Sequence, residues 1–169
     1  MRRFIQLIET MNDFLSGKVQ GVILFLLMCL VLVDVTTRYA LQNPLSIAEE
    51  YGAYMLVAIT CMGLAYTWKE KTHVRIEILV DRLPLRAQRV LRLITLVLAF
   101  LFTLFMIPAA YQLISFSFMF GTRSGGWLRT PIAWPQITIL IGALLLFFQL
   151  IVEIIKAVKA LQEDKKEVR

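Results

Sequence analysis

The stretch Gly21-Val-Ile-Leu-Phe-Leu-Leu-Met-Cys-Leu-Val-Leu-Val33 contains no charged side chain. It forms the centre of an apolar run over residues 19–41, and a helix of about 20 residues is enough to cross the hydrocarbon core of a bilayer. Asp34 and Arg38 stand four residues apart near the end of this run. The sequence therefore predicts a first transmembrane helix over 19–41 that carries a charged pair near one end.

Three more apolar runs follow, over residues 46–68, 90–120 and 132–155. At about 1.5 Å per residue, the run 90–120 is longer than the hydrocarbon core is thick, so we expect that helix to tilt or to protrude into water. Pro108 is expected to bend it. The four runs predict an all-α integral membrane protein with four transmembrane helices, in which residues 1–169 form a single membrane domain.

The composition agrees with a membrane protein rather than a soluble one. Of the 169 residues, 59% are hydrophobic, and the mean hydropathy is +0.72. Soluble domains are usually about 45–50% apolar. The net charge of +6 does not indicate nucleic acid as a partner, because the basic residues lie at the ends of the apolar runs, where membrane topology accounts for them.

The segment before the first run, residues 1–18, is amphipathic. Its apolar side chains recur at helical spacing, at Phe4, Leu7, Ile8, Met11, Phe14 and Leu15. Most of its polar side chains fall on the other side, at Arg2, Arg3, Glu9, Asn12 and Asp13. This pattern predicts a helix that lies in the membrane interface. The alternative is a short soluble extension of the first span.

Positive charge predicts the orientation of the chain. Of the 18 Lys and Arg residues, three lie in the N-terminal segment, seven in the connector that ends at Arg92, and five in the tail 156–169. The two remaining loops hold three, at Arg38, Arg123 and Arg129. Because cytoplasmic loops carry an excess of Lys and Arg, we expect both termini in the cytoplasm. The connector 69–89 is expected to lie along the interface.

The residue types that enzymes need are scarce. His73 is the only histidine, Cys29 and Cys61 lie inside apolar runs, and Gly125-Gly126 lacks the lysine of a phosphate loop. The sequence therefore predicts no enzyme, no metal site and no cofactor. A small four-helix exporter that acts alone as an oligomer is the alternative function. It would need an ionisable residue deep in a helix, and Asp34 has Arg38 beside it.

The order of residues between Arg38 and Glu77 resembles a known family. The pattern reads Arg38-Tyr39, Asn43-Pro44-Leu45-Ser46, Glu49-Glu50, Gly63 and His73-Val-Arg-Ile-Glu77. It is similar to the small membrane subunit of the tripartite ATP-independent periplasmic (TRAP) transporters. Ile47 and Ala48 depart from the family, which often has a tryptophan just before the acidic pair. Ser46 with Glu49 also matches a capping box at the start of a helix.

The resemblance implies a role in the bacterial inner membrane. A large membrane subunit would carry sodium and substrate and move as an elevator, and this small subunit would be a static helper that widens the scaffold. A periplasmic binding protein would deliver an organic acid, such as a dicarboxylate, a sialic acid or a sulfonate. No sodium site is expected in this chain.

Two groups of residues are candidates for contacts with these partners. The candidates for contact with the large subunit are Asp34, Arg38, Glu49, Glu50, Gly52, Gly63 and His73. The candidates for contact with the binding protein are Arg123, Trp127 and Arg129. Each has a simpler alternative: ion pairs within the chain, glycines tolerated in a membrane helix, or a tryptophan that anchors a loop at the interface.

Overall fold

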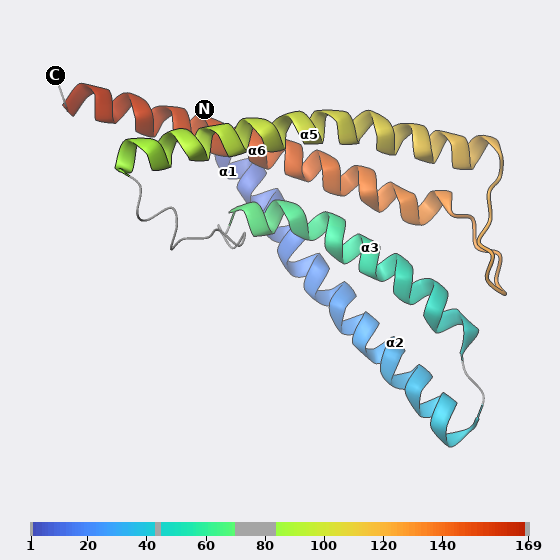
Figure 1. Ribbon diagram of the computed structural model, residues 1–169. Coiled ribbons are helices and arrows are strands. Elements are labelled where there is room, and N and C mark those ends of the chain that lie inside the picture. Colours follow the sequence, from blue (N-terminus) through green and yellow to red (C-terminus); the bar gives the residue numbers. More distant parts are fainter. Residues whose placement is uncertain (1, 43–44, 70–83, 168–169) are drawn as a thin grey trace.

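The computed structural model of this protein describes residues 2–42, 45–69 and 84–167, and its regular elements are helical (Figure 1). The elements are α1 (Arg2–Asn12), η1 (Asp13–Val19), α2 (Gln20–Ala40), α3 (Ser46–Lys69), α5 (Leu85–Met119) and α6 (Ala133–Glu167). The predicted runs 19–41 and 46–68 agree with α2 and α3 within one residue. α5 begins before the predicted run 90–120, on the side of the connector, and α6 continues beyond the predicted run 132–155 into the tail.

The N-terminal segment is helical, as predicted, and its place in the membrane interface stays a prediction. A stretch of π-helix, η1, joins α1 to α2 without a break, so one helical path leads into the first apolar run. Asn12, predicted on the polar face, is buried together with Ser16, whereas the apolar side chains of Met11 and Phe14 are exposed. The segment therefore buries Ile8 together with part of its polar side against the protein, and it leaves the apolar side chains of Met11 and Phe14 exposed.

The helices form two pairs, which meet where α3 packs against α6. In Figure 1, α2 runs beside α3, α5 runs beside α6, and α2 diverges from α5 and α6. α3 packs against both α2 and α6, which connects the two pairs, and α1 also touches α6. The buried apolar cluster lies where α3, α5 and α6 meet, and it consists of Ala65, Leu96, Leu145, Leu146, Leu150 and Ala157.

A glycine permits the close approach of α3 to α6. A Cβ atom built on Gly142 would lie 2.5 Å from the backbone oxygen of Cys61 and 2.8 Å from its Cβ atom. Real Cβ atoms do not come this close to backbone, so only glycine fits at this position. Small residues at such crossings let membrane helices approach closely, and close packing is a main source of their association.

Both chain termini lie at one end of the helices, which we call the terminal end (Figure 1). The turn between α2 and α3 and the loop between α5 and α6 lie at the other end, which we call the loop end. The last turn of α1 lies beside α6, where Glu9 pairs with Lys156 at 2.7 Å.

Three helical stretches in the described part of the chain are long and apolar enough to cross a membrane. They are Ile8–Ala40, Val90–Met119 and Ala133–Val158. α3 has 24 residues but is not among them, and its Tyr51, Tyr54 and Tyr66 make it less apolar. The protein is therefore an all-helical membrane protein, and the crossing by the predicted span 46–68 is still a prediction.

We expect Gly142→Ala to lower the stability of the isolated chain by about 1–3 kcal/mol, the usual cost of overpacking a well-packed contact. The added methyl group meets the backbone of Cys61, which cannot move without shifting α3. Thermal unfolding in detergent micelles, followed by circular dichroism, measures the effect. Gly21→Ala is the matched control, since a Cβ there meets nothing within 4 Å. Equal melting temperatures for the two variants would contradict the close crossing.

Candidate functional site

Asp34 ties the end of α2 to the start of α3. Its carboxylate is buried, with only 9% of the residue exposed. Arg38 donates to Asp34 Oδ2 at 3.0 Å, and the backbone N–H of Leu45 donates to Asp34 Oδ1 at 2.9 Å. A carboxylate that accepts bonds from a guanidinium and a backbone amide is well compensated for its burial. The predicted pair of Asp34 and Arg38 therefore acts as a brace for the turn between the helices.

Glu49 joins this pair from the outside. Its carboxylate lies 3.6 Å from Arg38, and its side chain is 79% exposed. Exposed ion pairs contribute about 0–1 kcal/mol, so this contact adds little. The capping box predicted for Ser46 and Glu49 is not formed. α3 begins at Ser46, so Leu45 occupies the N-cap position, and the Leu45 amide donates to Asp34 of α2. Arg38, 44% exposed, keeps one face open to a partner.

Glu50, the next residue along the chain, belongs to a different set of contacts. Its Oε1 accepts a hydrogen bond of 3.0 Å from the Tyr54 hydroxyl. Its Oε2 is buried, points at Gly126 in the loop between α5 and α6, and has no partner within hydrogen-bonding geometry. Ser124 and Thr130 of the same loop lie beside the carboxylate. The acidic pair is thus divided between two neighbours.

The loop between α5 and α6 is a small hairpin. Arg123 and Pro131 form an antiparallel bridge, and the backbone N–H of Ser124 donates to the Thr130 oxygen at 2.8 Å. Arg123, Trp127 and Arg129 are exposed on it, with Trp127 86% exposed. The three candidates for contact with the binding protein therefore lie together on one exposed hairpin at the loop end.

The two candidate glycines of α3 face α2 of the same chain. A Cβ on Gly52 would lie 3.7 Å from the Leu27 side chain, and one on Gly63 would lie 2.5 Å from the Gln20 side-chain nitrogen. Gln20 donates from that nitrogen to the backbone oxygen of Ile59 at 3.1 Å. Both glycines therefore lie on the face of α3 that packs against α2 within the chain. His73 lies outside the described residues.

A second polar cluster, at the terminal end, was not predicted from the sequence. Asn12 donates to Gln149 Oε1 at 2.6 Å across a buried contact between the N-terminal segment and α6. One turn further along α6, Glu153 accepts bonds from Arg92 at 2.9 Å and from Lys156 at 3.2 Å. The signal that points to it is the polar pair Gln149 and Glu153, four residues apart inside an apolar run.

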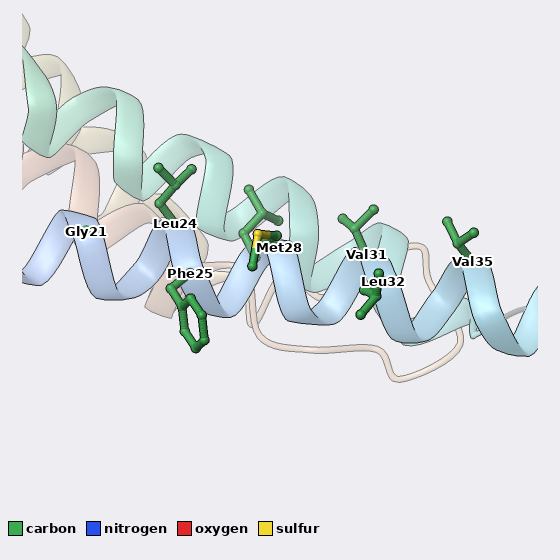
Figure 2. Close-up of a pocket in the computed structure, with 8 residues that line it drawn as sticks. Gly21, Leu24, Phe25, Met28, Val31, Leu32 and Val35 are labelled. Carbon is green, nitrogen blue, oxygen red and sulfur yellow. The ribbon is translucent and has the colours of Figure 1, made fainter.

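The outer surface of α2 is an apolar groove. Figure 2 shows lining side chains that project from successive turns of the helix: Leu24, Phe25, Met28, Val31, Leu32 and Val35, with Gly21 at one end. Leu27 also lines the groove. Most of these side chains are exposed, and they give α2 a surface suited to lipid or to another membrane subunit. Within the described residues there is also no cluster of three His, Cys, Asp or Glu that could hold a metal ion.

We expect Glu153→Ala to destabilise the isolated chain by about 3–5 kcal/mol, because it leaves the partly buried Arg92 guanidinium without its carboxylate. Lys156→Ala is the control. The Lys156 side chain is 43% exposed, and the ion pair between Glu153 and Arg92 is retained in this variant. The loss of unfolding free energy should therefore be about 0–1 kcal/mol. Equilibrium unfolding in mixed micelles gives both values. A smaller loss for Glu153→Ala than for Lys156→Ala would mean that the cluster does not secure α5 to α6.

Comparisons with known proteins agree with the resemblance found in the motif. The family described as "Tripartite ATP-independent periplasmic transporters, DctQ component" matches residues 27–160, which is most of the chain. A Haemophilus influenzae protein named "Putative TRAP transporter small permease protein" is 34% identical over 73 residues, which are 43% of this chain. The matched region spans 45% of that relative, less than half of its length. The chain belongs to the family of small permease components of TRAP transporters.

Proposed function

We propose that this chain is a static helper that widens the scaffold of a large membrane subunit in a bacterial inner membrane. In this proposal the large subunit carries sodium and an organic acid, and a periplasmic binding protein delivers that acid. Membership of the small-permease family supports a transporter complex with a large subunit. The sodium coupling, the acid and the binding protein are what the family resemblance implies.

The placement of charge is the observation that carries the helper role. The described ion pairs lie at the loop end, around Asp34, or at the terminal end, around Glu153 and Asp13. Between the ends, the apolar runs contain no Asp, Glu, Lys or Arg. The hydroxyl of Thr103, which is buried in α5, donates a hydrogen bond of 2.8 Å to the backbone oxygen of Ala99. Transport sites in membranes usually use ionisable residues near the midplane, so the substrate path fits the large subunit better.

Exposed apolar helix surfaces support the same proposal. α2 contacts α3 and η1 and leaves its groove side open. α5 exposes a row of large apolar side chains that includes Phe102, Phe105 and Phe116. A helper that enlarges a scaffold needs such surfaces on both flanks, one for the large subunit and one for lipid.

We further propose that α3 crosses the membrane, which gives four spans. At about 1.5 Å per residue, its 24 residues measure about 36 Å, enough to cross a hydrocarbon core of about 30 Å. α3 packs between α2 and α6, both of which belong to stretches able to span, so it shares their layer. Four spans place both termini on one side of the membrane, and the distribution of Lys and Arg favours the cytoplasm.

The topology predicts which positions an impermeant reagent reaches from outside intact cells. In a chain with Cys29 and Cys61 replaced by alanine, we expect Gly125→Cys to react with an impermeant maleimide. Met11→Cys should react only after the membrane is permeabilised, because α1 would face the cytoplasm. Both residues are exposed in the chain, and labelling of position 11 after permeabilisation checks that lipid does not cover it. Labelling of position 11 in intact cells would contradict the orientation.

The helper role predicts that the chain transports nothing alone. Liposomes that contain only this chain should show no sodium-driven uptake of the acid that the binding protein carries. Liposomes that also contain the large subunit should take it up when loaded binding protein is added. The measurement is accumulation of the radiolabelled acid under a sodium gradient. Uptake by the small chain alone would overturn the helper role and favour the self-sufficient exporter, run in reverse.

A further inference from the structure

We propose that Glu50 is a positioning residue, which holds the hairpin 122–132 so that Arg123, Trp127 and Arg129 face an acidic surface of the soluble binding protein. This inference rests on the proposed function. It separates Glu50 from Glu49 and gives the half-buried Glu50 side chain a role within the chain.

The two sides of the hairpin are joined by a few backbone hydrogen bonds. Besides the Ser124–Thr130 bond, the backbone N–H of Ile132 donates to the Thr122 oxygen at 3.2 Å. At the tip, the N–H of Arg129 donates to the Gly126 oxygen at 3.2 Å, with Arg129 in the left-handed region at φ 49°. These bonds fix the shape of the hairpin. The backbone N–H of Thr122 also donates to the Ser117 oxygen at 3.1 Å, which ties the base of the hairpin to α5. The direction of the part beyond this base depends on a further contact.

Glu50 supplies that contact from α3. A Cβ atom on Gly126 would collide with Glu50 Oε2, and the carboxylate carbon would be 3.2 Å away, so the carboxylate lies directly against the glycine backbone. Tyr54, one turn along α3, holds the other carboxylate oxygen. One oxygen of the Glu50 carboxylate is therefore held by Tyr54 of the same helix, and the other oxygen contacts the hairpin at Gly126.

The exposed side of the hairpin has a clear chemical character. Residues 122–132 contain two arginines and no acidic residue. No ion pair joins Arg123 or Arg129 to a carboxylate among the residues that the structure describes. Arginine and tryptophan are enriched at the centres of protein interfaces. The complementary partner is a soluble surface with acidic residues around an apolar patch.

Pre-organisation explains why a hairpin of this kind needs a fixed direction. A docking loop that is already in its bound orientation loses less conformational entropy on binding, and its affinity is higher for that reason. Removal of the contact with Glu50 should therefore weaken docking without removing any group that touches the partner.

The experiment compares four variants in the complete transporter complex, reconstituted in nanodiscs. We expect Glu50→Ala and Gly126→Ala to weaken binding of the loaded binding protein about tenfold, which corresponds to about 1.4 kcal/mol. Both should also speed trypsin cleavage after Arg123 and Arg129, measured by mass spectrometry. Gly126→Ala is informative because it displaces the carboxylate and keeps its charge. Gly125→Ala, where a Cβ meets nothing within 4 Å, should keep the wild-type cleavage rate.

Arg129→Ala separates contact from positioning. It should weaken binding while the rate of cleavage after Arg123 stays at the wild-type value. Recovery of the complex and its melting temperature are measured for each variant, so a general loss of folding is seen directly. If Glu50→Ala and Gly126→Ala match wild type in cleavage and binding, the positioning role is wrong and the proposed function stands. If they speed cleavage and leave binding unchanged, the hairpin is a lipid-anchored loop. If the wild-type complex does not bind the binding protein, the proposed function itself fails.

Discussion

Helices in lipid gain no hydrophobic free energy by touching one another, and this constraint shapes every contact in the chain. Association has to come from close packing and from polar bonds. Both are concentrated on α6, where Gly142 admits the backbone of α3 and where Gln149 and Glu153 bind the N-terminal segment and α5. α2 has less of either, and it is held to α3 by Asp34 at one end and by Gln20 near the other.

The division into polar ends and an apolar middle suits a helper subunit. The buried acids at the two ends, Asp34 and Glu153, are satisfied by other groups of the same chain. The middle of the helices then presents apolar surface alone, and α2 shows this most clearly in Figure 2. Such a surface packs equally well on lipid or on another subunit, which is what a scaffold helper requires.

The two neighbouring acids of α3 illustrate how a helix distributes function. Successive residues are separated by about 100° around the axis, so Glu49 and Glu50 point to different sides. Glu49 reaches back toward Arg38 of α2, and Glu50 reaches across to the hairpin between α5 and α6. One short acidic sequence thereby contacts both α2 and the hairpin between α5 and α6.

Helix positions and the Asp34–Arg38 pair were predictable from the sequence, because both depend on local periodicity. An apolar run defines a span wherever it lies, and two residues four apart meet on any helix. The partners of Asn12, Glu50 and Gly142 were decided only by the tertiary structure. Asn12 and Gln149 are 137 residues apart, and no periodicity links them. Which side chains meet at such distances depends on how the helices cross, and the crossing is set by packing that no single segment contains.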